Sequence, residues 1–425
     1  METLSGNAAQ VSEREIEPAV VASCSAGLAL KSAVRRDETI RRLGGDGFCF
    51  PMTWSADDRQ LVAVGDGTGW PEIPKDRPYK RYSSRLFAID GDPNSAVFEE
   101  VAGYPDVPTW EYINGSVPPY YSLGMLAVEG HIYQYLSTCT HRWQEKSDVQ
   151  FNGAKLIYST DNGRTWRNQN GSTPVIKELH GSQSRENMAF FLEPQNAFSI
   201  LTFLQMGKDY RENRDGYVYV YSPNGTTEGT MNELVMFRVP KGQVLDRGAY
   251  EFFGGLRTDG GAHWIKDINS RGVVHTFPHG LISPAWPMAW QPSVVYNGPL
   301  GLYMMANSNS TGGEALASKP SYLGIWISAN PWGPWKQIHE ETEWTPQGDA
   351  NARAGWPQIA PKWIAADGRS FWLVWTDVQQ TAPGDFNSPV LKSPNEADFN
   401  QNLLRWKKYH PYWSFNTQRF DLVVA

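Results

Sequence analysis

Residues 159–166 read Ser-Thr-Asp-Asn-Gly-Arg-Thr-Trp and fit the pattern Ser-x-Asp-x-Gly-x-x-Trp. In such a segment the Asp161 carboxylate can accept hydrogen bonds from main-chain N–H groups of its own turn, and Gly163 permits a left-handed residue. The Trp166 ring can then pack the hairpin between neighbouring sheets. We predict that the segment is the turn between the third and fourth strands of an antiparallel sheet. The pattern indicates a fold and says little about chemistry.

Short strand-like segments surround this turn and recur along the chain in groups. The groups span residues 52–101, 122–167, 188–238, a shorter unit at 249–253, 288–328 and 358–424. The chain also has 18 Trp, 19 Tyr, 18 Phe and 39 Gly, which is typical of sandwiches, barrels and propellers. We therefore predict an all-β fold, a β-propeller with six or seven four-stranded blades. Residues 46–425 are expected to form this single domain, and residues 1–45 an N-terminal extension that is disordered or partly helical, with the helix at 26–42.

Charge and hydropathy make some classes of partner improbable. The formal net charge is −7 and basic residues form only short runs, so we expect no nucleic-acid partner. No apolar run approaches the roughly 20 residues that cross a bilayer, so we expect no membrane partner. The N-terminus lacks a basic region followed by an apolar core, which leaves the localisation open. We expect a monomer, and the cysteines, Cys24, Cys49 and Cys139, suggest no disulfide framework.

The predicted order of strands places several polar residues in connections that open on one face of the ring. These connections lie between the second and third strands of a blade and between one blade and the next inner strand. The candidate catalytic residues there are His141, Tyr210, Arg211 and Arg238. The candidate substrate-binding residues are Arg142, Arg214, Tyr121, Trp54, His275 and Gln291. We expect the residues in these connections to converge on one rim, namely His141, Arg142, Tyr210, Arg211, Arg214, Asp215, Arg238, His180, His275 and His279.

These residue types suit the cleavage of a uronic-acid-containing saccharide by β-elimination. The C5 proton of the uronate must be removed, and cations beside its carboxylate stabilise the enolate-like intermediate. In this hypothesis His141 is the base or a carboxylate partner, Tyr210 is the acid or base, and Arg211 and Arg238 neutralise the carboxylate. Two alternatives stay open: a glycoside hydrolase that uses Asp215 or a nearby acid, and a carbohydrate-binding propeller without catalysis. The expected partner is an anionic oligo- or polysaccharide.

A metal site is not indicated by the spacing of the histidines. His275 and His279 are four residues apart, but Pro278 and Gly280 make the segment a loop. We predict no metal ligand and no definite cofactor, and a structural calcium ion stays open.

Several motifs between residues 45 and 345 carry a resemblance to a known family. They are Gly45-Asp-Gly-Phe48, Met52-Thr-Trp54, Val64-Gly-Asp-Gly67, Met206-Gly-Lys-Asp-Tyr210, Arg214-Asp-Gly-Tyr217, Arg238-Val-Pro-Lys241, Asp246-Arg-Gly-Ala249 and Trp332-Gly-Pro-Trp335. With them the chain resembles a family of microbial propellers of formerly unknown function. That family is similar to propeller polysaccharide lyases that act on ulvan and on rhamnose–glucuronate linkages.

The resemblance implies a His and a Tyr as base and acid, with Arg near the substrate carboxylate. Such lyases have two histidines in early blades, whereas here His141 stands alone and Tyr121 takes the place of the other. The pattern at 159–166 is also the Asp-box of sialidases. In sialidases an Arg-Ile-Pro motif precedes the box, whereas Phe237-Arg-Val-Pro240 follows it here, so a sialidase is not favoured.

Overall fold

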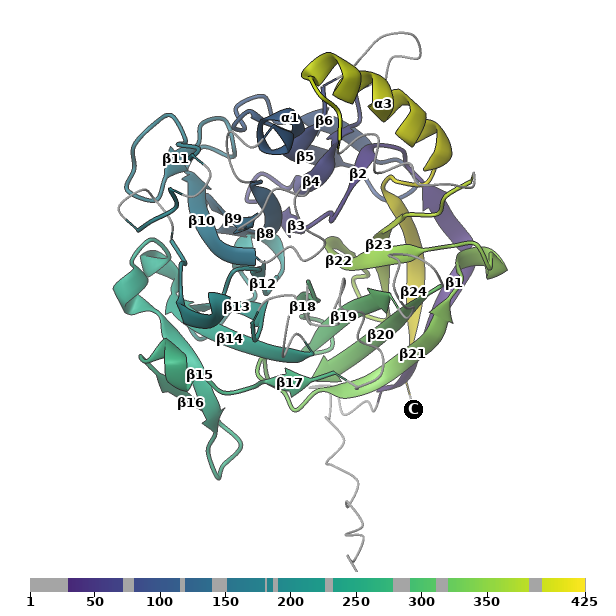
Figure 1. The fold of residues 1–425 in the computed structure, drawn as a ribbon. Helices are drawn as coiled ribbons and strands as arrows, with labels where there is room; N and C mark the ends of the chain where they lie inside the picture. The colour runs from purple at the N-terminus through teal and green to yellow at the C-terminus, as the bar shows by residue number, and fades with distance from the viewer. Residues whose placement is uncertain are drawn as a thin grey trace, which may run out of the picture.

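The structure is a computed structural model, and it describes residues 30–71, 80–114, 119–139, 151–179, 182–185, 190–225, 232–277, 291–310, 320–381 and 392–424. Five antiparallel sheets stand side by side around a central axis and form a five-bladed β-propeller (Figure 1). The prediction of an all-β propeller is confirmed, and the prediction of six or seven blades is wrong.

Each blade has four main strands, which follow one another outward from the axis. Blade 1 contains β2 (Asp46–Phe48), β3 (Met52–Trp54), β4 (Gln60–Gly69), β5 (Tyr82–Asp90), β6 (Val97–Glu100) and β7 (Val107–Pro108). Blade 2 contains β8 (Tyr121–Val128), β9 (His131–Cys139), β10 (Phe151–Ser159) and β11 (Arg167–Asn168). Blade 3 contains β12 (Thr202–Phe203), β13 (Tyr217–Pro223), β14 (Glu233–Pro240), β15 (Glu251–Leu256), β16 (Ala262–Ile265) and β17 (His275–Thr276).

The last two blades complete the ring. Blade 4 contains β18 (Ser293–Asn297), β19 (Leu302–Ser310), β20 (Ser321–Ser328) and β21 (Lys336–Trp344). Blade 5 contains β22 (Ala354–Ile364), β23 (Ser370–Asp377), β24 (Asn416–Val424) and β1 (Leu30–Arg42).

Strand β1 joins the two ends of the chain. It pairs antiparallel with β24, from Leu30 opposite Val424 to Arg42 opposite Asn416, and forms the outer edge of blade 5 (Figure 1). The helix predicted over residues 26–42 is therefore wrong for residues 30–42, and residues 1–29 lie outside the described residues. Closing a ring with strands from both ends leaves no unpaired terminal blade.

The blade count differs from the prediction because blade 3 was divided into two units. Residues 188–192 and 198–203 suggested two strands, and 249–253 suggested a new blade. In the structure Gln195, Asn196 and Phe198 have positive φ values, which interrupt any strand before β12. Segment 249–253 runs into β15, the fourth strand of the same blade. The buried rings of Phe190, Phe191 and Phe198 belong to the core, although no named strand carries them.

The turn of residues 159–166 joins β10 to β11 in blade 2. The Thr165 main-chain N–H donates to Asp161 Oδ1 at 2.9 Å, and the Trp166 indole N–H donates to Gly163 O at 2.9 Å. Gly163 has a φ of 85°, in the region that favours glycine. These bonds fix the hairpin and leave the buried Trp166 ring between blades.

The inner strands β3, β8, β12, β18 and β22 surround the axis, each in contact with the next. Polar side chains connect them: Ala127 N donates to Thr53 Oγ1 at 2.8 Å, and Ile359 N donates to Ser293 Oγ at 2.9 Å. Gln205 Nε2 donates to Met125 O at 2.8 Å. A cavity of about 10 Å³ lies between these strands.

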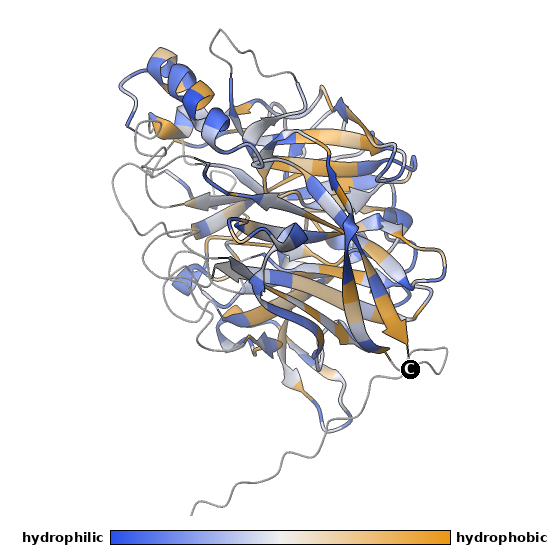
Figure 2. Ribbon diagram, turned by 90° about the vertical axis from the view of Figure 1, so that its right-hand side faces the viewer, coloured by the Kyte–Doolittle hydropathy of each residue, from blue (hydrophilic) through white to orange (hydrophobic). Residues whose placement is uncertain are grey.

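The two ends of the axis differ in what covers them. We call the end where the inner strands begin the front end, and the end where they finish the back end. Helices α1 (Thr109–Ile113) and α3 (Glu396–Tyr409) lie at the front end, toward the viewer in Figure 1 and on the left of Figure 2. Within the described ranges, no helix combines the length and the apolar composition that a bilayer crossing needs.

Candidate functional site

Tyr210, Arg211 and Arg214 lie at the back end, in the connection between β12 and β13. The prediction had placed them between the second and third strands of a blade, and it is wrong because β12 is the first strand of blade 3. Tyr210 is 1% exposed, and its hydroxyl accepts a hydrogen bond from Tyr219 N at 3.4 Å. Burial raises the pKa of Tyr210 well above its ordinary value. Arg211 and Arg214 are exposed to solvent.

Arg238 and Trp54 also lie away from the front end. Arg238 is on β14, the third strand of blade 3, where its Nη2 is 2.8 Å from Glu251 Oε2. Its guanidinium lies over the rings of Tyr217 and Trp264, with distances to the ring centres of 4.0 Å and 4.5 Å. Trp54 ends β3 and donates its indole N–H to Asp58 at 3.0 Å.

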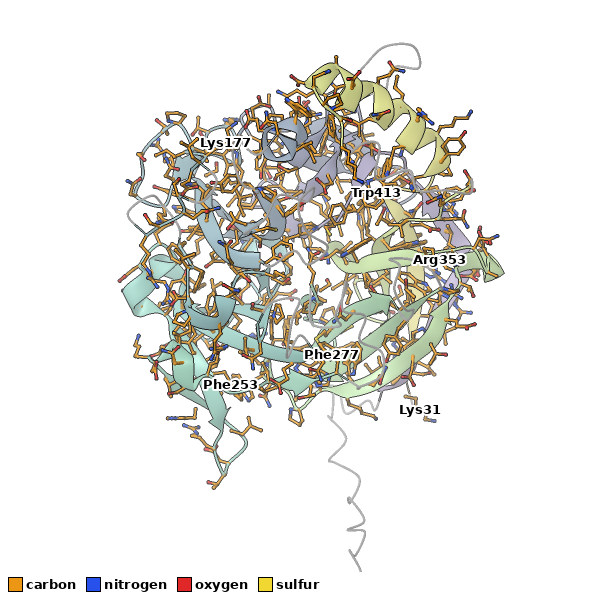
Figure 3. The ribbon with its side chains drawn as sticks, in the orientation of Figure 1. Lys31, Lys177, Phe253, Phe277, Arg353 and Trp413 are labelled. Atoms are coloured by element: carbon orange, nitrogen blue, oxygen red, sulfur yellow. The ribbon has the colours of Figure 1, made fainter. Side chains whose placement is uncertain are left out.

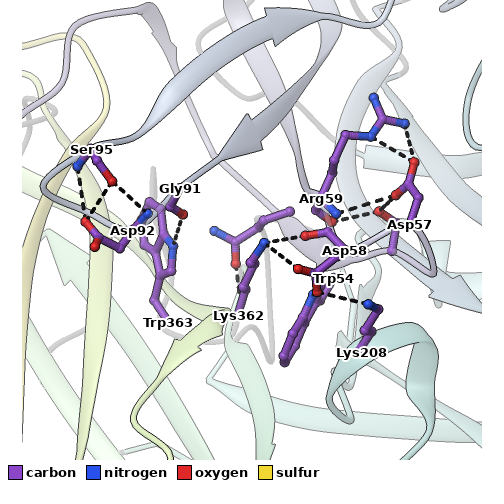
Figure 4. A network of polar contacts seen from close by, with 12 residues as sticks. Trp54, Asp57, Asp58, Arg59, Gly91, Asp92, Ser95, Lys208, Lys362 and Trp363 are labelled. Atoms are coloured by element: carbon purple, nitrogen blue, oxygen red, sulfur yellow. Dashed lines mark hydrogen bonds and ion pairs between the residues drawn. The ribbon is translucent and has the colours of Figure 1, made fainter.

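Asp58 is the centre of a charged network at the back end (Figure 4). Its Oδ1 lies 3.0 Å from Lys208 Nζ of blade 3, and its Oδ2 lies 3.4 Å from Lys362 Nζ of blade 5. These contacts with Lys208, Trp54 and Lys362 lower the pKa of Asp58 to about 2, although the side chain is 56% exposed. The network connects blades 1, 3 and 5, and it pairs the Asp58 carboxylate with two lysines.

His275 lies between blades 3 and 4, far out along the blades. Its ring packs edge-to-face against Phe277, and also against Trp326 on β20, the third strand of blade 4. Burial lowers the pKa of His275 to about 4. His141, Arg142, His180 and His279 lie outside the described residues. The predicted rim is thus not formed by the residues that the structure describes, because they are divided between the two ends and the outer strands.

Tyr121 and Gln291 do lie at the front end. Tyr121 begins β8, is 3% exposed, and has its ring centre 6.5 Å from that of Phe48 on β2. Gln291 lies two residues before β18 begins at Ser293, and its Nε2 donates to Leu123 O on β8 at 3.0 Å. These two predicted substrate-binding residues therefore reach the same region from blades 2 and 4.

An aromatic cluster occupies this end, and we call it the front cluster. It consists of Phe48, Tyr121, Trp356, Trp406 and Trp413, packed with Phe399 and Leu403 of α3. Phe48 has its ring centre 5.0 Å from Trp356 and 5.1 Å from Trp413, and Trp413 is 4.9 Å from Trp406. Figure 3 places Trp413 close to α3. The cluster draws on blades 1, 2 and 5 and on the helix.

Trp356 is the strained member of the front cluster. It has a φ of 53°, which is unfavourable for a bulky residue, and it stands where the pairing of β22 with β23 is irregular. Its ring is only half-buried, and its main-chain N–H donates to Ser308 Oγ at 3.2 Å. Strain of this kind is concentrated at binding and catalytic sites. The sequence signal was Gly355-Trp356-Pro357, since proline interrupts the ladder of an inner strand.

Sequence reasoning also missed helix α3, which places Trp406 in the cluster. Phe399, Leu403 and Trp406 are its buried residues, and their spacing puts them on one face. The Asn395 side chain caps the helix by accepting from Asp398 N. The spacing and the cap together were sufficient to predict this helix.

Charged groups lie directly beside the front cluster. Asp46 begins β2, is 1% exposed, and has its Oδ1 3.3 Å from Lys407 Nζ on α3. The Arg81 guanidinium lies 4.7 Å from the centre of the Trp406 ring. His410 follows α3, and no described residue hydrogen-bonds to either ring nitrogen. Burial, and then the charges of Arg81 and Lys407, lower the pKa of His410 to about 4, against an opposing effect of Asp46.

A second carboxylate, Asp377, lies at the end of β23 in blade 5. It is 1% exposed, and its Oδ1 accepts from the main-chain N–H groups of Arg353 and Gln379 at 2.8 and 2.9 Å. Burial raises its pKa above the ordinary value. The Thr376 hydroxyl donates to Gly47 O at 3.2 Å and connects blades 5 and 1. Asp377 follows Thr376 and Asp46 precedes Gly47, so the two carboxylates flank this bond.

Buried polar atoms without partners gather at the starts of the inner strands. Within the described part of the chain, the atoms are Ser122 Oγ, Ser199 Oγ, Thr202 Oγ1, Gln291 Oε1 and Gln358 Nε2. They come from blades 2, 3 and 5 and from the segments that enter blades 3 and 4. Buried polar groups are normally hydrogen-bonded, so such atoms call for ordered water or for hydroxyl groups of a ligand.

Metal ligands do not assemble in the part of the chain that the structure describes. No group of three His, Cys, Asp or Glu side chains there could hold a metal ion. At the front end, Asp46 is paired with Lys407, and Asp377 accepts from main-chain N–H groups.

Several solved structures share a weak likeness with the chain. A Bacteroides ovatus protein, provisionally described as a hydrolase, has 13% identity and a TM-score of 0.46, with 89% of this chain and 87% of that chain covered. The α-L-arabinofuranosidase of Podospora anserina has 10% identity and a TM-score of 0.44, with 92% and 95% covered. The catalytic domain of a Coprinopsis cinerea α-L-arabinofuranosidase has 10% identity and a TM-score of 0.44, with 92% and 97% covered. Likeness this weak decides neither the function nor the residues of the site.

No curated protein matches the chain significantly. A family model does match, over residues 123–338, which are half of the chain and span blades 2, 3 and 4. The description of that family is a domain of unknown function. The chain therefore belongs to the family of the domain of unknown function DUF4185.

Proposed function

We propose that the chain is a glycoside hydrolase that binds its saccharide across the front end of the axis. The observation that carries this proposal is Trp356, a strained and half-buried ring at the edge of the front cluster. Aromatic faces pack against the C–H faces of sugar rings, and strained residues are kept where function needs them. Gln291 Oε1 and Gln358 Nε2, which have no hydrogen-bond partner in the described part of the chain, would accept from and donate to sugar hydroxyls at the same end.

The carboxylates that we propose for hydrolysis are Asp46 and Asp377. Hydrolysis of a glycosidic bond uses one protonated carboxyl group and one carboxylate. The raised pKa of Asp377 suits the acid, and Asp46, held beside Lys407, suits the carboxylate. A β-elimination has less support, since Tyr210 is buried at the back end and Arg238 is paired with Glu251 on the outer strands.

A second candidate function is carbohydrate binding without cleavage. It is favoured by the burial of Asp46 and Asp377, each of which already has partners within the protein. Both candidates share the front end as the place where sugar binds, and they differ in whether a product appears.

The test is to incubate the protein with neutral and uronic-acid polysaccharides and to measure reducing ends together with absorbance of the unsaturated product. Hydrolysis predicts reducing ends without that absorbance. Asp377→Asn should abolish the product and retain binding. Trp356→Ala should weaken binding of the saccharide, and Trp332→Ala, outside the front cluster, is its matched control. Saturable binding without product would favour the second candidate, and the unsaturated absorbance would overturn both.

A further inference from the structure

A cavity of about 210 Å³ lies away from the axis, between blades 1 and 2. Its inner wall consists of buried residues: Val107, Tyr120, Leu136, Lys155 and Trp166. Its rim is formed by two connecting segments, residues 103–106 and 174–177. Figure 3 places Lys177, one of the rim residues, toward the outside of the ring. The cavity is therefore distinct from the front cluster.

Lys155 is the residue that sets this cavity apart. Its side chain is 2% exposed, although lysine is rarely buried, and it projects from β10 into the wall of the cavity. Among the described residues, its one recorded acceptor is Glu178 Oε1, at 3.4 Å. An ammonium group has three N–H donors, so a single long hydrogen bond leaves donor capacity at the cavity wall.

Glu178 already has hydrogen-bond partners within the protein. The Tyr120 hydroxyl donates to Glu178 Oε2, and the Glu178 main-chain N–H donates to the Tyr120 oxygen at 2.9 Å. The carboxylate balances the charge of Lys155 within the wall. The Lys155 ammonium can therefore donate to a further hydrogen-bond acceptor in the cavity, whereas its charge is already balanced by Glu178.

The rim is balanced in the same way. Lys177 Nζ is 2.5 Å from Glu111 Oε2, and Lys80 Nζ is 2.8 Å from Asp106 Oδ2. An anionic ligand would meet the Glu178 carboxylate without an unpaired cation to compensate, and a cationic ligand would meet Lys155. An uncharged ligand avoids both penalties. The remaining wall is apolar and includes the Trp166 ring, which suits the C–H face of a ring compound.

We propose that this cavity binds one uncharged, hydroxylated ring about the size of a single pyranose. A ligand hydroxyl accepts from the Lys155 ammonium, and the body of the ring packs between Leu136, Val107 and Trp166. The cavity has room for several water molecules, which such a ligand would displace. The proposal concerns a second site and does not depend on the front cluster.

The experiment measures binding of D-xylose and D-glucose by titration calorimetry, with acetate as an anionic probe. We expect one or both sugars to bind and acetate not to bind. Val175→Trp fills the cavity from its half-buried rim, and Lys155→Met removes the donor while keeping the length of the side chain. Each substitution should weaken sugar binding about tenfold or more. Trp332→Ala, which lies in neither the cavity lining nor the front cluster, should leave this binding unchanged.

Three results would overturn the proposal. They are the absence of binding for both sugars, binding that Val175→Trp does not weaken, and binding of acetate in preference to the sugars. Because Lys155→Met leaves Glu178 buried without its cation, its thermal midpoint is compared with that of the wild type. If this variant does not fold, Val175→Trp alone decides. Loss of sugar binding in Trp356→Ala but not in Val175→Trp would place the sugar at the front end only.

Discussion

The front and back ends of the axis are built on the same five blades, but they satisfy their polar groups differently. At the back end, Asp58 is bound by Lys208, Lys362 and Trp54, so its charge is paired across three blades (Figure 4). At the front end, Trp356 has a positive φ, and several polar atoms at the starts of the inner strands have no hydrogen-bond partner among the described residues. The charged pairs of the back end connect blades, and the contrast is the reason for our proposal that the saccharide binds at the front end.

The largest expected effect comes from detaching α3 from the front cluster. Leu403→Ala removes a fully buried side chain and should lower the free energy of unfolding by about 2–5 kcal/mol. Chemical denaturation measures this change. Leu404→Ala, on the less buried side of the helix, is the control and should cost clearly less. Equal losses in the two variants would mean that α3 does not hold the front end together.

The stability of the protein should fall at acidic pH because His410, at the front end, is buried and resists protonation. The pKa of His410 is lowered to about 4, while an unfolded His titrates near 6.5, so the unfolded state binds the proton first. Stability is therefore fully present above about pH 6.5 and is lost as the pH falls toward 4, by about 3 kcal/mol at most. Thermal midpoints across this range measure it. His275, with a similarly lowered pKa, adds to the same window, so His410→Phe should remove only part of the slope. An unchanged slope in His410→Phe would contradict this assignment.

Trp356→Ala should weaken saccharide binding by about 1–3 kcal/mol, because a stacking surface is lost. The thermal midpoint should change little, since the relief of an unfavourable φ offsets part of the lost packing. Binding titrations with the saccharide identified in the polysaccharide screen measure the first effect. Trp332→Ala serves as the control, and a loss of binding in the control of equal size would argue against a specific role for Trp356.

The smallest effect is expected at the back end. Asp58→Asn keeps the shape of the side chain and removes the charge, and the site is more than half exposed, so the loss should stay below about 1 kcal/mol. The lowered pKa of Asp58 stabilises the fold above about pH 4, and this contribution is lost as the pH falls toward 2. Denaturation at low and high salt measures the change, which salt should screen. A loss of saccharide binding in this variant would contradict the division of roles between the two ends.

Much of the fold could be predicted from the strand patterns, but the blade count could not. Blades 1 and 2 were predicted nearly strand for strand, because their segments alternate or are continuously apolar and are bounded by turns. Blade 3 was divided because the buried Phe190, Phe191 and Phe198 resemble strand residues, while the positive φ values of Gln195, Asn196 and Phe198 itself prevent a strand. The sequence of Leu30–Arg42 suggested a helix. In the structure this segment is a strand, and its partner β24 lies nearly 400 residues further along the chain.

The candidate site depended on that same counting of strands. When β12 is recognised as the first strand of blade 3, Tyr210, Arg211 and Arg214 move from the front end to the back end. Tyr121 and Gln291 lie at the front end because they stand at the starts of the inner strands β8 and β18. The start of β8 was predicted to within one residue, whereas the strand predicted over residues 288–295 begins at Ser293 within the described residues.

The sequence by itself determined the all-β propeller class, most strands of blades 1 and 2 and the turn at 159–166, since these depend on side-chain alternation and on the conformations allowed to glycine and asparagine. The tertiary structure alone decided the number of blades, the closure by β1 and β24, and the grouping of Phe48, Tyr121, Trp356, Trp406 and Trp413. The physical reason is that alternation is local, whereas the end of the axis that a connection reaches depends on which strand of each blade is innermost.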